Sequence, residues 1–93
     1  MSEQKIAKLF RVRGRVQGVG FRYFVNQSAG ALGVRGWVRN DDDGSVEVYA
    51  VGTTTQLSEL AGYLWKGPRW AEVRGVDESE AALEDHAGFS VRQ

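Results

Sequence analysis

The chain is organised around one stretch of sequence, Gly14-Arg15-Val16-Gln17-Gly18-Val19-Gly20-Phe21-Arg22, which separates an extended run from a helical one. Its three glycines let the backbone turn tightly and point successive N–H groups into one concavity. The helix that follows adds unpaired N–H donors and the positive end of its dipole. These features are typical of an anion site, most obviously for phosphate, and Arg22 lies where its guanidinium can close over the anion.

Length, composition and charge limit the classes of protein to which the chain can belong. Its 93 residues suffice for one domain, 1–93, and 42% of them are hydrophobic, which is enough for one core. The 12 basic and 12 acidic residues balance, which argues against a generic nucleic-acid binder. No apolar run approaches the ~20 residues that cross a membrane. Without cysteine there is no disulfide framework, and with a polar N-terminus, Met1 to Lys5, we expect a soluble cytoplasmic protein.

Hydrophobic periodicity and turn residues predict the order of the secondary-structure elements. We expect strands at 6–13, 34–40 and 45–51, a fourth from Ala71 with a bulge at Gly75, a last strand at 89–92, and helices at 21–32 and from Thr53 to Gly67-Pro68. Apolar residues on both faces of the first strand indicate a central strand, and an acidic stretch, 77–85, separates the fourth strand from the last. This order predicts an α+β fold, a ferredoxin-like βαββαβ sandwich with two helices on one face of an antiparallel sheet, plus a short C-terminal strand.

The glycine-rich stretch has a plainer interpretation, a flexible connection with a solvated arginine. Composition argues against it, because a connection needs one or two turn residues and not glycines at the first, fifth and seventh of nine positions. The stretch also lacks the third glycine of the dinucleotide fingerprint and the Gly-Lys-Ser/Thr ending of the P-loop. An anion site of another kind is therefore the favoured interpretation.

Other polar and aromatic residues have structural interpretations. Asn40, at a strand end, would in isolation be a turn-starting residue. The three aspartates after it, 41–43, lack the spacing of a calcium loop, so we expect a solvated hairpin tip and no metal site. His86, the only histidine, is expected on the surface. The larger aromatic residues are expected to be packing residues and helix cover and not a base-stacking surface, namely Trp37, Trp65, Trp70, Tyr49 and Tyr63.

Two motifs carry a resemblance to a known family. The pattern Val12-x-Gly14-x-Val16-Gln17-Gly18-Val19-x-Phe21-Arg22 resembles the first signature of the acylphosphatase family. The run Gly36-Trp37-Val38-Arg39-Asn40, with Gly44, Val46 and Gly52 at their spacings, resembles the second. The segment from Gly67-Pro68 to Val76 and the ending Phe89-Ser90-Val91-Arg92 are also similar to the family, although Gln93 replaces a terminal aromatic residue often seen there.

The resemblance implies hydrolysis of the carboxyl–phosphate bond of small acyl phosphates to a carboxylate and inorganic phosphate, without a metal or another cofactor. It implies that Arg22 binds the phosphoryl oxygens and that Asn40 orients the attacking water. It also implies that main-chain N–H groups hold those oxygens, from Arg15, Val16, Gln17, Gly18, Val19 and Gly20.

The partners implied by the resemblance are small. They are an acyl phosphate and, in the loop, inorganic phosphate or a similar anion, with no nucleic acid or membrane, and a monomer is the default state. Two alternatives stay open. One is a non-catalytic ferredoxin-like module that binds phosphate, RNA or a protein. The other is an accessory domain acting on carbamoyl phosphate, as similar domains do inside larger maturation proteins.

Overall fold

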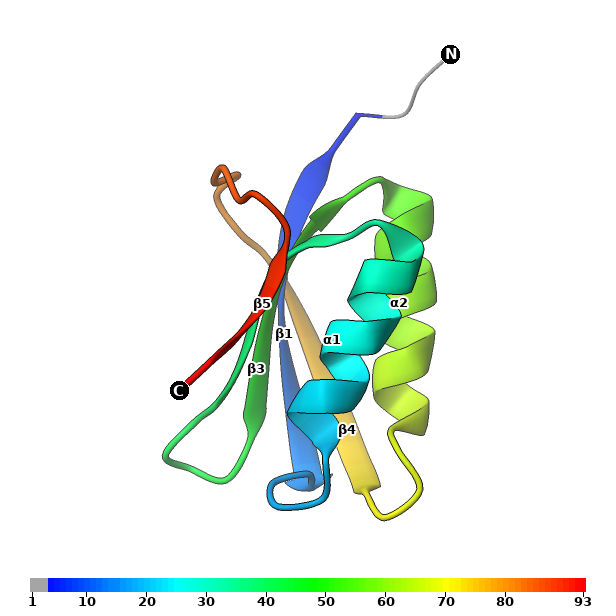
Figure 1. The fold of residues 1–93 in the computed structure, drawn as a ribbon, viewed down its shortest axis with the longest axis vertical. Coiled ribbons are helices and arrows are strands. Elements are labelled where there is room, and N and C mark those ends of the chain that lie inside the picture. Colours follow the sequence, from blue (N-terminus) through cyan, green and yellow to red (C-terminus); the bar gives the residue numbers. More distant parts are fainter. Residues whose placement is uncertain (1–3) are drawn as a thin grey trace.

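The helices and strands follow one another in the order predicted from the sequence (Figure 1). The computed structural model describes residues 4–93, and residues 1–3 of the predicted polar N-terminus lie outside the described part. The elements are β1 (Ile6–Arg15), α1 (Phe21–Leu32), β2 (Arg35–Asn40), β3 (Val46–Gly52), α2 (Thr54–Lys66), β4 (Glu72–Glu80) and β5 (Phe89–Arg92).

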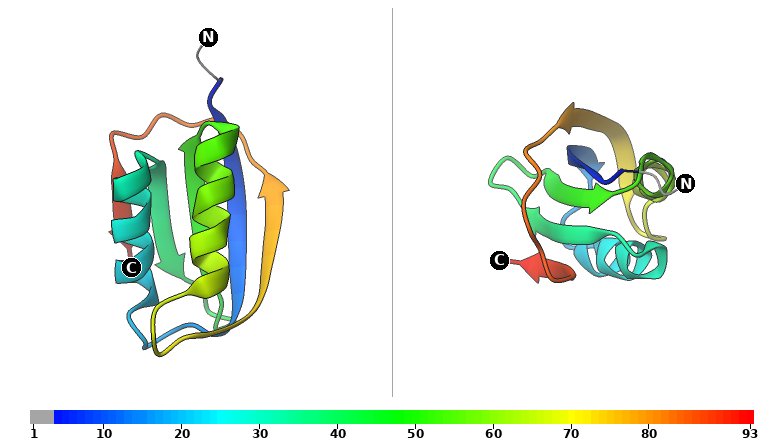
Figure 2. Two further views of the ribbon diagram at one scale, coloured as in Figure 1. Left: turned by 90° about the vertical axis from the view of Figure 1, so that its right-hand side faces the viewer. Right: turned by 90° about the horizontal axis from the view of Figure 1, so that it is seen from above.

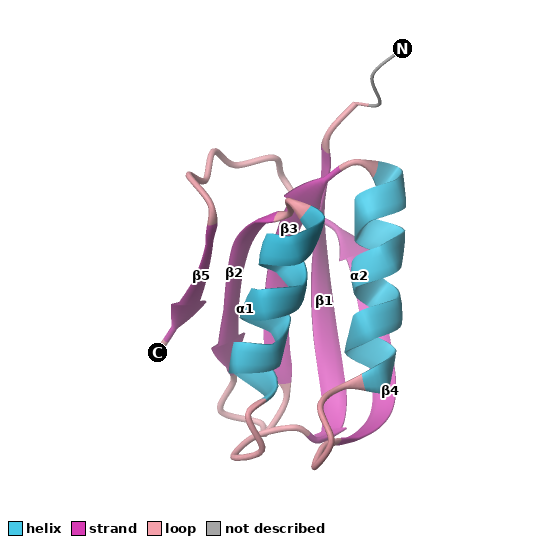
Figure 3. Ribbon diagram, turned by 45° about the vertical axis from the view of Figure 1, so that its right-hand side comes forward, coloured by secondary structure: helices cyan, strands magenta, loops and turns pink. Residues whose placement is uncertain are grey.

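The strands form one five-stranded sheet in the order β4-β1-β3-β2-β5. Neighbouring strands are antiparallel except for β2 and β5, which run parallel. Both helices cover the same face of the sheet, as Figure 2 and Figure 3 show. The predicted fold class is therefore confirmed: an α+β, ferredoxin-like βαββαβ sandwich, with β5 added beside β2.

The core lies between the sheet and the two helices. Alternate residues of the central strands point into it, among them Phe10, Val12 and Val48, and all three are fully buried. The helices contribute residues at helical spacing, which are Phe21, Val25, Ala29, Leu57, Leu60 and Leu64. Each fully buried large side chain of this kind stabilises the fold by roughly 1.5–3 kcal/mol. Neither described helix is long and apolar enough to cross a membrane.

The fourth strand is longer than predicted. β4 continues through 77–80, which the sequence analysis assigned to an acidic stretch outside the strands. Backbone pairing with β1 continues over these residues, and two cross-strand ion pairs accompany it. Nζ of Lys8 lies 3.0 Å from Oε1 of Glu78, and Nε of Arg13 lies 2.9 Å from Oδ2 of Asp77. The acidic residues of this segment therefore pair with the basic side chains of β1 across the sheet.

The end of β1 differs from the prediction in two respects. The strand finishes at Arg15, which pairs with Glu72 of β4. The pairing skips Arg74, so the β-bulge predicted at Gly75 lies one residue earlier. At Gly14, with φ 126°, an added Cβ would collide with the carbonyl oxygen of Glu72. Gly14 is thus required by the close approach of two strands and is not part of the turn.

The face of the sheet that the helices leave open carries a second, smaller cluster. Trp37 stacks on Tyr49 with the ring centroids 5.8 Å apart. The hydroxyl of Tyr49 donates to the carbonyl oxygen of Ala82 and accepts from the N–H of Glu84. His86 lies 5.3 Å from the Tyr49 ring and is partly buried, which corrects the predicted surface position.

Two of the tryptophans also depart from the prediction. Trp65 and Trp70 are 52% and 71% exposed, so they are not packing residues. Tyr63 does cover a helix, because its ring lies edge-on to Phe24 of α1 with the centroids 6.4 Å apart. The helical periodicity of α2 places its leucines correctly, whereas size and aromaticity alone misplace its tryptophan.

Candidate active site

The turn between β1 and α1 contains the residues predicted to bind an anion. Gly18 and Gly20 have φ angles of 74° and 79°, left-handed values that favour glycine. A Cβ on either residue would meet no atom within 4 Å, so glycine is needed for the backbone angle and not for space. The β2–β3 hairpin and the end of β5 lie at the same end of the molecule as this turn (Figure 1).

The first turn of α1 has no side-chain cap. Gly20 is the N-cap residue, and among residues 4–93 no side chain caps this helix and no acidic residue occupies its first turn. The first N–H groups of a helix have no acceptor within it, and the dipole makes this end positive. A cation there opposes the dipole, yet Arg22 occupies the position. The start of α1 therefore concentrates donors and positive charge, a combination that suits an anion.

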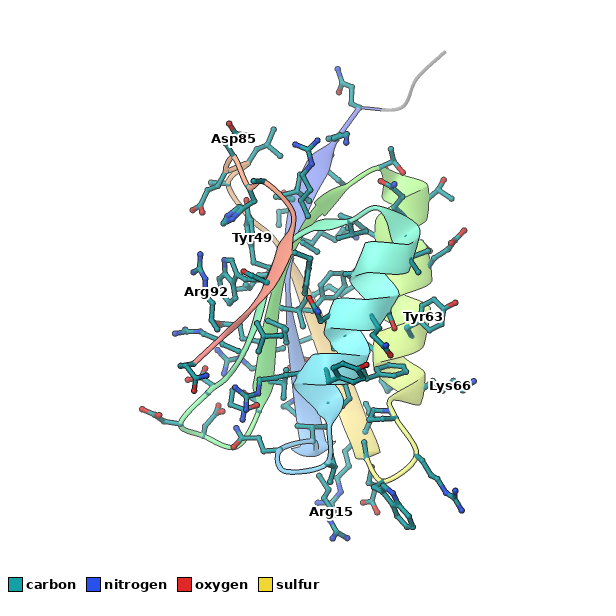
Figure 4. The ribbon with its side chains drawn as sticks, viewed as in Figure 1. Arg15, Tyr49, Tyr63, Lys66, Asp85 and Arg92 are labelled. Carbon is teal, nitrogen blue, oxygen red and sulfur yellow. The ribbon has the colours of Figure 1, made fainter. Side chains whose placement is uncertain are left out.

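The Arg22 side chain is partly buried and contacts β5. Its Nη1 donates to the carbonyl oxygen of Arg92 at 3.3 Å, which orients one edge of the guanidinium. The Arg92 side chain leaves β5 on the side away from the helices (Figure 4), where its guanidinium lies 4.8 Å from the centroid of the Trp37 ring. A guanidinium has five N–H donors in a planar fork, so donors remain for a ligand.

A hollow of about 360 Å³ brings the two predicted catalytic residues together. Arg22 lines it from α1 and Asn40 lines it from β2. The lining is completed by Val16, Gly18, Gly20, Phe21, Tyr23, Val91 and Gln93. The other predicted loop residues, Arg15, Gln17 and Val19, are outside this lining, and Figure 4 shows Arg15 at the tip of β1.

Asn40 faces the hollow from the last position of β2. It pairs with Val46 across the hairpin, which fixes its backbone. Its side-chain amide has no hydrogen-bond partner among the described residues, 4–93. The amide is therefore held at the hollow by its backbone and remains available to a ligand or a water molecule.

The side chain of Gln17 joins the glycine turn to the β2–β3 hairpin. Its Nε2 donates to the carbonyl oxygen of Asp41 at 2.7 Å and to that of Ser45 at 2.9 Å. These two residues begin and end the hairpin turn, and the N–H of Asp41 donates to the same Ser45 carbonyl. One amide thus sets the separation between the glycine turn and the residue next to Asp41, which is Asn40. The sequence analysis gave Gln17 a main-chain role only and missed this contact.

Comparison with known proteins gives the family of the chain. A family model described as acylphosphatase matches residues 8–91. The chain belongs to the acylphosphatase family. Membership favours the acyl phosphate hydrolase implied by the sequence motifs over a non-catalytic module, and it confirms the resemblance on which that expectation was based.

Individual acylphosphatases are similar along nearly their whole length. One from Solibacter usitatus (strain Ellin6076) is 56% identical over 86 residues, which cover 92% of this chain and 90% of the relative. One from Pasteurella multocida (strain Pm70) is 56% identical over 88 residues, covering 94% and 98%. The structure of an acylphosphatase from Coxiella burnetii superposes with a TM-score of 0.91 at 39% identity, covering 95% of this chain and 93% of that one.

In this acylphosphatase-family chain, Arg11 organises the hairpin that follows β2. Its Nη1 lies 3.0 Å from Oδ2 of Asp41, 2.9 Å from Oδ2 of Asp43 and 3.1 Å from Oγ of Ser45. Its Nη2 lies 3.2 Å from Oε2 of Glu47. The aspartates predicted to form a solvated tip are thus partly engaged in an ion-pair network. Strand β1 therefore holds the hairpin by a side chain in addition to its backbone ladder.

The charges of this hairpin perturb one another. Hydrogen bonds from the hydroxyl and the N–H of Ser45, followed by the charge of Arg11, lower the pKa of Asp43. Burial acts to lower the pKa of Arg11, but the hydrogen bond with Asp41 and the neighbouring carboxylates outweigh it and raise that pKa. Asp43 and Arg11 are therefore both ionised at neutral pH, and the ion pair between them is kept there.

One end of the hollow is the start of α1 with Arg22, which is positive and rich in N–H donors, and side chains of α1 and β5 form its walls. Among residues 4–93, no three His, Asp or Glu side chains are grouped to hold a metal ion. Tyr23, Val91 and Gln93 line the hollow but were not predicted as site residues. Tyr23 follows Arg22 directly and was overlooked, whereas Val91 and Gln93 carried no local signal, because they reach the site only when β5 pairs beside β2 and contacts α1. The contact between Arg22 and the carbonyl of Arg92 was missed for the same reason.

Proposed function

We propose that the chain hydrolyses the carboxyl–phosphate bond of small acyl phosphates, releasing a carboxylate and inorganic phosphate. One observation carries the proposal: the uncapped start of α1, Arg22 and Asn40 line a single hollow. In this proposal residues 1–93 act as one domain, as a monomer in the cytoplasm, and no metal takes part. A small acyl phosphate is the substrate, and inorganic phosphate occupies the same hollow as product.

The phosphoryl group is held by main-chain N–H groups of residues 15–20 and by Arg22. The uncapped helix start supports this assignment because its first N–H groups have no acceptor within the helix, and the left-handed glycines let successive N–H groups of the turn converge. Hydrogen bonds to a charged partner contribute about 1.5–3 kcal/mol each, and the guanidinium fork can bind two oxygens at once. Catalysis of phosphoryl transfer depends mainly on positioning and on stabilising charge, so a preformed cradle is its main requirement.

Asn40 orients the attacking water. Its amide oxygen accepts a hydrogen bond from the water, whose oxygen attacks phosphorus while the bond from phosphorus to the acyl oxygen breaks. The electron pair of that bond stays on the departing carboxylate, and the proton of the water passes to the phosphate or to solvent. A carboxylate at position 40 would be repelled by the substrate, whereas an amide is neutral. Because a carboxylate is a good leaving group, a strong general acid is not required.

Hydrolysis of benzoyl phosphate in the presence of EDTA tests the proposal. We expect wild-type turnover to survive EDTA and kcat to fall about 100-fold or more in Asn40→Ala, because the water is no longer oriented. Inhibition by inorganic phosphate should stay within about twofold of wild type, since Asn40 acts mainly in the transition state. Asn26→Ala, one turn after Arg22 on α1 and outside the lining of the hollow, is the matched control and should resemble wild type.

Three results would contradict the proposal in different ways. Loss of phosphate inhibition in Asn40→Ala would make Asn40 a binding residue. Loss of wild-type activity with EDTA would show that a metal is needed. Equal background rates for wild type and Asn40→Ala would leave the non-catalytic module that binds phosphate or RNA.

A further inference from the structure

The hollow has an apolar side that phosphate binding does not use. Tyr23 is 65% exposed and Val91 is 43% exposed, and both line the hollow that also contains Arg22. Large apolar side chains left exposed around a polar centre are typical of a ligand-binding surface. A phosphate alone would gain nothing from them, because it is small, charged and held from the other side.

The two side chains come from separate elements that meet at the hollow. Tyr23 follows Arg22 in the first turn of α1, and Val91 is on β5, where it pairs with Val38 of β2. The hydroxyl of Tyr23 accepts a hydrogen bond from Nε2 of Gln27 at 2.8 Å, one turn further along α1. This bond restrains the ring before any ligand arrives, which reduces the entropy lost on binding.

We propose that Tyr23 and Val91 form the binding site for the acyl group and select large apolar acyl groups, aromatic or branched aliphatic, over acetyl. The inference rests on the proposed function, in which the glycine turn and Arg22 hold the phosphoryl group. With the phosphoryl group at that end, the acyl substituent extends towards the remaining walls of the hollow. Those walls offer an aromatic ring and a branched aliphatic side chain to it.

Binding of two phosphonates that cannot be hydrolysed tests the site without turnover. Phenylphosphonate carries a large apolar group and methylphosphonate a small one, on the same anionic head. We expect wild type to bind phenylphosphonate about tenfold more tightly by calorimetry, since about 50 Å² of apolar surface is buried against the ring and Val91. Tyr23→Ala should reduce that preference to about twofold, and Val91→Ala should reduce it less.

Two further variants separate apolar contact from other effects. Tyr23→Phe keeps the ring but loses the hydrogen bond with Gln27, so it should retain most of the preference. Trp65→Ala removes another exposed aromatic, 52% exposed and outside the hollow, and should behave as wild type. Inhibition by inorganic phosphate should be unchanged in all these variants, a result that general damage to the fold would not give.

A parallel turnover measurement keeps the two proposals distinguishable. The ratio of kcat/KM for benzoyl phosphate to that for acetyl phosphate should fall about fivefold in Tyr23→Ala. Failure of wild type to hydrolyse either substrate would overturn the proposed function, while the phosphonate preference would still decide the acyl site. Equal affinity of wild type for both phosphonates, or an unchanged preference in Tyr23→Ala, would overturn the acyl site.

Discussion

The two helices begin in opposite ways. α2 follows a complete capping box, in which the hydroxyl of Thr53 accepts from the N–H of Gln56 at 3.1 Å and Oε1 of Gln56 accepts from the N–H of Thr53 at 2.8 Å. α1 follows Gly20, has no side-chain cap among the described residues, and carries Arg22 where the helix dipole disfavours a cation. The helices are otherwise alike, with 12 and 13 residues on the same face of one sheet.

This contrast separates stability from function. A side-chain cap contributes about 1 kcal/mol, and α1 lacks that contribution although its packing resembles that of α2. A cap on α1 would occupy the N–H groups that the hollow presents. We infer that the bare start is retained because the donors serve a ligand, and that the capped start of α2 serves the fold alone. The predictions below test this division from its largest expected effect to its smallest.

Placing a carboxylate at the start of α1 should abolish most activity. In Gly20→Asp the new carboxylate would repel the substrate from the donors at the helix start, and a Cβ there meets no atom within 4 Å. Gly20→Asn is the matched control, because asparagine also tolerates the left-handed angle but is neutral. We expect kcat/KM for benzoyl phosphate to be about 100-fold lower in Gly20→Asp than in Gly20→Asn. Similar rates for the two variants would show that the substrate does not approach this end of α1.

Replacing the guanidinium by an ammonium tests the second positive group of the α1 start. We expect Arg22→Lys to lower kcat/KM about 30-fold, because the charge remains but the planar fork that binds two oxygens is lost. Arg92→Lys is a suitable control, since only the backbone carbonyl of that residue contacts Arg22. Near-normal turnover in Arg22→Lys, measured with benzoyl phosphate, would show that the helix start holds the phosphoryl group without the fork.

Removal of the Gln17 side-chain contact tests whether catalysis requires the hairpin at a fixed distance from the start of α1. In Gln17→Leu both hairpin carbonyls keep a partner, because the N–H of Gly44 donates to Asp41 and the N–H of Asp41 donates to Ser45. The hairpin should therefore persist but move relative to the glycine turn. We expect kcat to fall about tenfold with phosphate inhibition unchanged, because positioning errors cost the transition state more than the ground state.

A double variant identifies the partner of Gln17. If Gln17 acts by placing Asn40, Gln17→Leu should have little further effect on kcat in an Asn40→Ala background. If the losses in kcat were additive, Gln17 would act independently of Asn40. It would then act on the glycine turn that binds phosphate, where the sequence analysis placed its main-chain N–H.

The sequence predicted what local chemistry determines. Periodicity and turn residues located both helices, and the structure shows the local reasons: Gly33 ends α1 in a left-handed conformation, and the Thr53 capping box begins α2. Arg22 and Asn40 were identified because each lies in a long motif. Both line the same hollow, as that identification requires, whereas their catalytic roles remain predictions.

The remainder depends on contacts between distant residues. The extension of β4 consists of backbone pairing with β1, accompanied by ion pairs such as that of Lys8 with Glu78, which a local acidic composition does not reveal. The Gln17 contact with the hairpin and the carbonyl of Arg92 at Arg22 likewise appear only once β1, β2 and β5 are assembled. Val91 shows the same limit, since it is an ordinary apolar residue until β5 brings it beside Tyr23 at the hollow.

The smallest expected effect comes from removing the cap of α2. Thr53→Ala deletes the hydroxyl that accepts from Gln56, while Nε2 of Gln56 still donates to the carbonyl oxygen of Leu32 at 2.8 Å. We expect the free energy of unfolding in urea to fall by about 1 kcal/mol with kcat/KM unchanged. Thr54→Ala, an exposed neighbour within the helix, should stay within about 0.5 kcal/mol of wild type. A loss of activity in folded Thr53→Ala would contradict the division, because it would show that the start of α2 influences the hollow through the end of α1.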